Sequence, residues 1–87
     1  MFNKNQFGER LRILRKRANE NQGDLAAILD VTITQISDME TGKRSTTLEK
    51  FALICEHYQV SADYLLGLID DPRPLNLEKM EEKEGKA

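Results

Sequence analysis

The segment from Gln22 to Arg44 constrains the fold of this chain more than any other stretch. Its pattern of apolar and polar residues predicts two short helices joined by a tight turn. The second helix ends at Gly42, and two cations, Lys43 and Arg44, follow it. Two helices arranged in this way can hold one of them in the major groove of DNA. The segment therefore predicts an α-helical domain and indicates a nucleic-acid ligand.

The first helix of this segment has a recognisable start and stop. Asn21 is its predicted N-cap, and Asp24, three residues later, can return a hydrogen bond to complete a capping box. Asp30 and Val31 occupy the turn, where one residue with a positive φ is required and Asp is tolerated. The helix buries a stripe of apolar residues at helical spacing: Leu25, Ala26 and Leu29.

The second helix is predicted to run from Thr32 to Gly42. Thr32 and Gln35 form a Thr-x-x-Gln capping box, and Gly42 supplies the left-handed residue that ends a helix. Ile36 and Met39 are three residues apart and are expected to face the core. The opposite face is then expected to carry Ile33, Thr34, Ser37 and Asp38.

These pieces belong to a longer pattern, which resembles the phage-repressor/Cro (XRE) family of helix-turn-helix domains. The resemblance runs in one colinear order from Phe7 to Gly67. The matching pieces are Phe7-Gly-Glu-Arg-Leu-Arg, Leu14-Arg15, Gln22-x-x-Leu25-Ala26, Val31-Thr32, Ile36-Ser-x-Met-Glu40-x-Gly42-Lys43-Arg44, Leu48-Glu49 and Val60-Ser61-x-x-Tyr64-Leu65-Leu66.

The resemblance implies one buried contact and includes four departures. In the family, the positions of Arg15 and Glu40 form a partly buried ion pair between the first and third helices; the alternative is a surface pair. The departures are Glu20 in place of an apolar residue, Asp30 in place of glycine, Thr46 in place of the frequent proline, and Asp38 in place of a polar or basic base-reading residue.

The fold expected from residues and resemblance together is all-α, a compact five-helix domain of the lambda-repressor type with a short C-terminal tail. The first helix is expected from near Gln6 to Arg17, and the last between Ser61 and Gly67. Residues 1–69 are expected to form the DNA-binding domain and residues 70–87 a charged tail, either an exposed helix or disordered. The other expected stripes are Phe7, Leu11, Leu14 and Ala18 in the first helix, and Leu48, Phe51, Ile54, Cys55 and Tyr58 in the fourth.

The charge distribution is more informative than the net charge of −2 over 87 residues. Cations gather before Ala18 and again at Lys43, Arg44 and Lys50, which predicts a basic face on a mildly acidic protein. There is no apolar leader and a single cysteine, so the expected location is cytoplasmic and no membrane association is expected.

The residue inventory argues against catalysis and metal binding. One cysteine and one histidine leave no zinc ligand set, and Ser37 has no histidine at a suggestive spacing. No glycine-rich phosphate loop is present, and no cofactor is expected. Cys55 is expected to be a buried thiol, and His57 a partly exposed structural residue. We therefore expect that the protein is not an enzyme.

The expected ligand is double-stranded DNA. Phosphate contacts are expected from Gln22, at the start of one helix, and from Thr41, Lys43 and Arg44 at the end of the next. Thymine methyl groups suit Ile33 and Thr34, an adenine edge or a phosphate suits Gln35, and cytosine N4 suits Asp38. The candidate base-reading residues are Thr32, Ile33, Thr34, Gln35, Ser37 and Asp38.

The expected function is transcriptional regulation by a homodimer on a palindromic operator, most simply as a repressor. Base contacts of roughly 1–3 kcal/mol each discriminate too little in one half-site, whereas a dimer combines two. An alternative is a protein-interaction module such as an antitoxin-type regulator, which Asp38 and the acidic balance favour slightly. The expected dimer surface comprises Leu66, Leu68, Ile69, Leu75, Leu77 and Met80.

Overall fold

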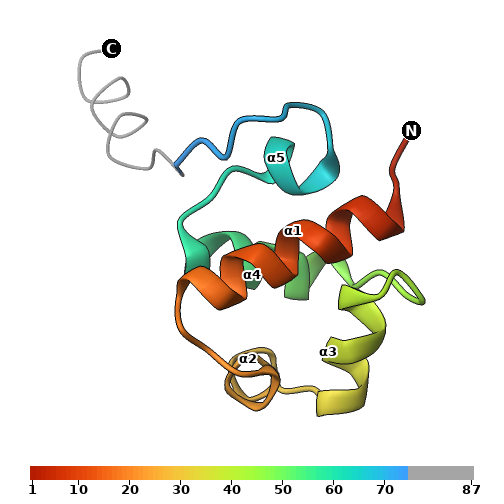
Figure 1. The fold of residues 1–87 in the computed structure, drawn as a ribbon, viewed down its shortest axis with the longest axis vertical. Coiled ribbons are helices and arrows are strands. Elements are labelled where there is room, and N and C mark those ends of the chain that lie inside the picture. The colour runs from red at the N-terminus through yellow and green to blue at the C-terminus, as the bar shows by residue number, and fades with distance from the viewer. Residues whose placement is uncertain (75–87) are drawn as a thin grey trace.

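The computed structural model describes residues 1–74, and within them five α-helices form the fold (Figure 1). No strand occurs in this part of the chain, so the predicted all-α fold is confirmed. Nor is any helix among these residues long and apolar enough to cross a membrane. The helices are α1 (Lys4–Arg17), α2 (Gln22–Leu29), α3 (Ile33–Glu40), α4 (Leu48–Tyr58) and α5 (Ala62–Leu66).

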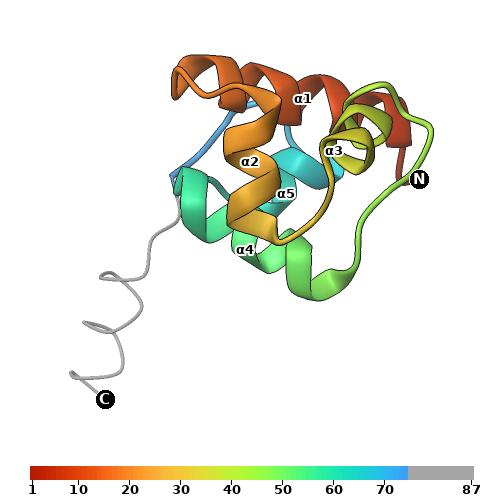
Figure 2. The same ribbon diagram turned by 90° about the horizontal axis from the view of Figure 1, so that it is seen from below.

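Helix α1 packs against both α3 and α5. In Figure 1, α5 lies on one side of α1, and α2 and α3 lie on the other. Figure 2 shows α1 and α4 on opposite sides of the domain, with α2 and α5 between them. The contacts of α1 with both α3 and α5 therefore fix the helix-turn-helix segment to the rest of the fold.

Side-chain caps explain where the helices begin. The predicted capping boxes are both present, Asn21 with Asp24 and Thr32 with Gln35. Helix α1 begins earlier than predicted because Asn3 Oδ1 accepts hydrogen bonds from the backbone N–H groups of residues 5 and 6. Satisfying these N–H groups extends the helix by one half-turn toward the N-terminus.

The turns use the left-handed backbone where the sequence predicted it. Asp30 has a φ of 54°, and Gly42 and Gly67 each have a φ of 82°. Asn19 and Gln59 also adopt positive φ, which was not predicted. Asn tolerates this conformation better than most residues, and Gln59 closes α4 with it.

The core is built from residues of all five helices, and it corrects two predictions. Ala18 is exposed because it caps α1 after the last turn, and Leu48 is 82% exposed because it is the first residue of α4. Tyr64, not assigned to the core from the sequence, is buried in it. The buried apolar residues are Phe7, Leu11, Leu14, Leu25, Ala26, Leu29, Ile36, Met39, Ile54, Cys55, Val60, Tyr64 and Leu65.

The described part of the expected tail, residues 70–74, runs back along the domain. The N–H group of Ser61 donates to the carbonyl of Arg73 at 2.8 Å, and Val60 forms an isolated antiparallel bridge with Pro74. Leu75, Leu77 and Met80, expected at the dimer surface, lie outside the described residues.

Candidate nucleic-acid interface

The inner side of α3 is fixed by a buried ion pair to α1. Arg15 Nε donates to Glu40 Oε2 at 2.5 Å and Nη2 donates to Oε1 at 3.1 Å, so the guanidinium holds the carboxylate with two bonds. Both residues are buried in the core region. The hydrogen bond to Glu40 raises the pKa of Arg15. The buried form of this pair, implied by the family resemblance, is therefore confirmed.

The pair also reaches the start of α2. Arg15 Nη1 donates to the carbonyl of Glu20 at 2.7 Å, and Gln22 Nε2 donates to Glu40 Oε1 at 3.1 Å. The loop before α2, α2 itself and α3 are thus tied together by one polar network. Because the amide of Gln22 points to Glu40, its predicted phosphate contact has to come from its second amide hydrogen or from the backbone N–H groups at the helix start.

A glycine allows α1 to lie directly on the end of α3. A Cβ atom at Gly8 would lie 2.3 Å from the carbonyl oxygen of Met39 and 2.6 Å from that of Glu40. No side chain fits at this distance from backbone atoms. The close approach brings Arg15 within reach of Glu40 and sets how far α3 projects from the domain.

The outer side of α3 carries most of the predicted base-reading residues. Thr32, Ile33 and Thr34 are exposed, whereas Gln35 and Ser37 are half-buried. The carbonyl oxygen of the Gln35 side chain accepts from the Thr32 N–H at 2.9 Å. Only the amide hydrogens of Gln35 therefore remain for a base or a phosphate.

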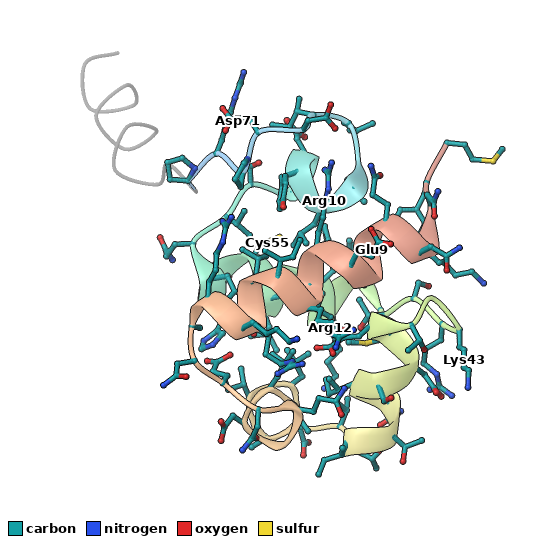
Figure 3. All side chains as sticks on the ribbon, viewed as in Figure 1. Glu9, Arg10, Arg12, Lys43, Cys55 and Asp71 are labelled. Carbon is teal, nitrogen blue, oxygen red and sulfur yellow. The ribbon has the colours of Figure 1, made fainter. Side chains whose placement is uncertain are left out.

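The turn after α3 presents the predicted phosphate-binding residues. The Asp38 carbonyl accepts from the N–H groups of Lys43 at 2.8 Å and Arg44 at 3.3 Å, and Thr41 Oγ1 donates to the carbonyl of Ser37 at 2.9 Å. The Lys43 side chain is exposed and extends from the edge of the domain beside α3 (Figure 3). The structure thus brings these cations to the C-terminal end of α3.

Asp38 and Arg44 form an ion pair that was not predicted. The Asp38 carboxylate lies 3.8 Å from Arg44 Nε, and the two side chains are 25% and 51% exposed. The sequence contains an indirect signal for this contact, because a helix that ends at Gly42 folds the next residues back over its last turn. The separation of six residues alone does not indicate it.

Three cations counted in the predicted basic face serve the fold instead. Besides Arg15, Arg10 donates to the carbonyls of Tyr64 and Ile69, and its guanidinium lies 4.3 Å from the centre of the Tyr64 ring. Lys50 Nζ donates to the carbonyl of Leu29 at 2.6 Å, at the end of α2. The basic face is therefore smaller than predicted.

Other cations are exposed and have no acidic partner within residues 1–74. Arg12 lies one turn from both Gly8 and Arg15, on the side of α1 that faces α3 (Figure 3). With Lys43 it leaves positive charge near the C-terminal end of α3. The exposed set is Lys4, Arg12, Lys16, Arg17 and Lys43.

Glu20, a departure from the family pattern, anchors the end of α4. Its carboxylate accepts from Tyr58 Oη at 2.7 Å and lies 2.6 Å from His57 Nε2. Burial, and then the hydrogen bond to Glu20, raise the pKa of Tyr58 well above its usual value. His57 is a partly exposed structural residue, as predicted.

Cys55 is buried, as predicted, and its burial raises the pKa of the thiol. Among residues 1–74, no three His, Cys, Asp or Glu side chains are grouped so that they could hold a metal ion. Within this part of the chain, Cys55 thus packs in the core and His57 makes a polar contact with Glu20.

Comparisons with known proteins agree with this geometry. A family described as a helix-turn-helix domain matches residues 6–66. The chain is 35% identical over 68 residues to the uncharacterized HTH-type transcriptional regulator YobD of Bacillus subtilis (strain 168). The match covers 78% of this chain but 61% of that relative, so the chain spans less than two thirds of its length.

Solved structures share the fold. The P22 c2 repressor, crystallised in complex with a synthetic operator, is 32% identical, with a TM-score of 0.65 over 69% of this chain and 91% of that one. The restriction-modification controller protein C.AhdI of Aeromonas hydrophila (24% identical, TM-score 0.63, 70% and 92% coverage) matches in fold. A transcriptional regulator from Listeria innocua also matches in fold: it is 22% identical, with a TM-score of 0.72 over 94% of this chain and 78% of that one.

The chain therefore belongs to the helix-turn-helix family of DNA-binding transcriptional regulators. In this class, α2 and α3 are the helix-turn-helix pair, and α3 occupies the place of the recognition helix.

Proposed function

We propose that this chain binds duplex DNA sequence-specifically by placing α3 in the major groove, and that it represses transcription as a homodimer. The observation that carries the proposal is the two-sided nature of α3. Its inner side is fixed by the buried Arg15–Glu40 pair, while its outer side is open and followed by exposed Lys43. A rigid helix with a free polar face is what direct readout of base edges requires.

The base-reading roles follow from the exposed groups. Ile33 and Thr34 present methyl groups suited to thymine, and the free amide hydrogens of Gln35 suit an acceptor on adenine or a phosphate. The Ser37 hydroxyl suits a base or a phosphate oxygen, and Asp38 suits cytosine N4. Thr32, occupied in its capping box, stands at the edge of this set.

Phosphate contacts are assigned to both ends of the helix pair. The N-terminus of α2 at Gln22 presents free backbone N–H groups, and Thr41, Lys43 and Arg44 follow α3. These contacts hold the register of α3 in the groove but carry little sequence information. Residues 1–69 are the proposed DNA-binding domain.

Dimerisation is proposed because one recognition helix reads too few base pairs. A dimer combines the base contacts of two half-sites that lie one helical turn apart, and its two-fold symmetry gives a palindromic operator. Leu68 is 70% exposed beyond α5, which supports a partner surface there. Ile69, proposed for the same surface, packs partly against the core. The operator complex reported for the P22 c2 repressor supports the choice of ligand.

Selection of bound sequences from a random pool of duplex DNA tests this proposal. We expect a palindromic consensus, and an affinity that falls with added salt because phosphates are neutralised. A consensus without two-fold symmetry would contradict the dimer.

The second candidate is an antitoxin-type interaction module, favoured by the acidic side chain of Asp38 on the face of α3. No enrichment in the selection, or binding to genomic DNA that does not depend on salt, would support this candidate instead.

A further inference from the structure

The ion pair between Asp38 and Arg44 joins an acid on α3 to a cation that the proposed function assigns to phosphate. The 3.8 Å separation of the Asp38 carboxylate and Arg44 Nε is close enough for attraction, but solvent reaches both groups. Exposed pairs of this kind are held weakly, so a competing ligand can separate them. The Arg44 side chain therefore has two possible partners, the carboxylate and DNA phosphate.

The backbone around the pair does not depend on this choice. The Asp38 carbonyl accepts from the N–H groups of Lys43 and Arg44, and at 3.4 Å from Thr41 Oγ1. These bonds hold the turn after α3 whether or not the two side chains are paired. Only the guanidinium has to move to exchange one partner for the other.

We propose that the carboxylate of Asp38 competes with DNA phosphate for Arg44, and that a cytosine amino group ends this competition by taking the place of the guanidinium at the carboxylate. At a site that presents cytosine N4 to Asp38, the amine donates to the carboxylate and Arg44 is released to a nearby phosphate. At other sites the carboxylate of Asp38 still competes with DNA phosphate for Arg44, and the phosphate contact is weakened. Asp38 is then a specificity-determining residue that links a base contact to a contact with a DNA phosphate. This inference rests on the proposed function, because it requires α3 in the major groove.

Three variants of the full chain test the exchange: Asp38→Asn, Arg44→Gln and the double variant. Asn removes the charge but keeps the size of the side chain and the backbone carbonyl that orders the turn. The probes are a duplex enriched by selection and a shuffled duplex of the same composition, each titrated over a series of salt concentrations. Glu9→Gln removes an exposed acid from α1 and serves as the matched control (Figure 3).

We expect Asp38→Asn to bind the shuffled duplex about 3- to 10-fold more tightly, since Arg44 becomes free for phosphate. The slope of log affinity against log salt should steepen by about one. Arg44→Gln should weaken binding to the selected duplex more than to the shuffled one. In the double variant the gain on the shuffled duplex should disappear.

Four results would overturn the exchange. One is an unchanged affinity and salt slope for Asp38→Asn on the shuffled duplex. Another is a gain that persists in the double variant or appears equally in Glu9→Gln, because removal of one negative charge then explains it. The third is an equal loss of affinity for both duplexes in Arg44→Gln. If Asp38→Asn does not fold, this third result decides the question by itself. The fourth is a consensus without a fixed C·G pair in each half-site.

These results are separable from failure of the proposed function. If the parent chain binds no duplex with salt dependence, DNA binding itself is wrong and the exchange falls with it. If the parent binds a consensus but the variants do not show the expected differences, only the exchange is wrong.

Discussion

Two Arg–carboxylate pairs lie on opposite sides of α3, and their environments give them different roles. Arg15 and Glu40 meet at 2.5 Å with side chains that are 9% and 3% exposed. Arg44 and Asp38 are separated by 3.8 Å and remain open to water. The chemical groups are the same and the two acids are two residues apart, so burial accounts for the difference.

The comparison teaches that burial decides whether a charge on α3 holds the fold together or remains free to bind a ligand. Breaking a buried pair leaves the other charge without water or a partner, whereas an exposed pair exchanges its partner for solvent. The inner side of α3 therefore maintains position, and the outer side keeps its groups free for a ligand.

The largest expected effect tests the inner pair. Glu40→Ala should lower the free energy of unfolding by roughly 3–5 kcal/mol, because Arg15 is left buried and unpaired. Asp38→Ala should change it by less than about 1 kcal/mol. Urea denaturation, monitored by circular dichroism, measures the free energy of unfolding of both variants. Equal midpoints for the parent and Glu40→Ala would erase the contrast between the two sides.

Gly8→Ala tests the close approach that brings the inner pair together. The added methyl group meets backbone carbonyls of α3, so we expect a loss of about 1–3 kcal/mol and weaker binding to DNA. Gly23→Ala is the control, because the nearest neighbours of a Cβ there, apart from its own helix backbone and the adjoining residues, are side-chain atoms, Asn21 Oδ1 at 3.2 Å and the end of Ile33 at 3.6 Å, rather than backbone carbonyls. Thermal unfolding compares the two variants; a Gly8→Ala domain as stable as the parent would contradict the packing described for α1.

Comparing Lys43→Ala with Thr34→Ala tests whether the outer side of α3 divides into phosphate contacts and base contacts. Lys43→Ala should weaken binding to all sequences about equally and reduce the salt slope by about one. Thr34→Ala should change preference at one position in each half-site, by no more than roughly 1–3 kcal/mol. Binding to the selected duplex and its single-base variants is the measurement. If both variants change the same quantity, the division between phosphate and base contacts is wrong.

The smallest effect concerns alkaline pH. Burial raises the pKa of Cys55, so the folded chain keeps a thiol proton that the unfolded chain loses as the pH rises. Stability is then present below the pKa of the unfolded thiol and declines as the pH rises above it. Tyr58, whose pKa is also raised, extends the decline to higher pH.

Urea midpoints at about pH 7 and pH 9.5 check this expectation, with Cys55→Ala as the control. The difference between the two pH values should be smaller in Cys55→Ala than in the parent. Identical differences would show that the thiol ionises equally in both states.

Much of the fold was predictable because its signals are local. The Thr32–Gln35 capping box and the left-handed Asp30 and Gly42 each depend on residues within one or two turns of the chain. The apolar stripe of α2 follows from helical spacing alone. The candidate base-reading residues followed in turn, because a helix with known inward positions has known outward ones.

The errors lie where the partner is distant in the sequence. Arg10 and Lys50 belong to basic clusters in the sequence, yet they donate to carbonyls of Tyr64, Ile69 and Leu29. Backbone carbonyls are present at every residue, so no residue type marks them as partners of a particular cation. Counting charges therefore overstated the basic face.

The sequence by itself determined five helices, the capping boxes of α2 and α3, the turn between these two helices, and which side chains face outward on α3. Hydrogen bonds and apolar contacts within a few residues are sufficient for this. Only the tertiary structure decided which cations bind groups of the chain itself, that Gln22 donates to Glu40, and that Arg44 lies 3.8 Å from Asp38. Those outcomes depend on burial and on distances between groups, which exist only once the helices have packed.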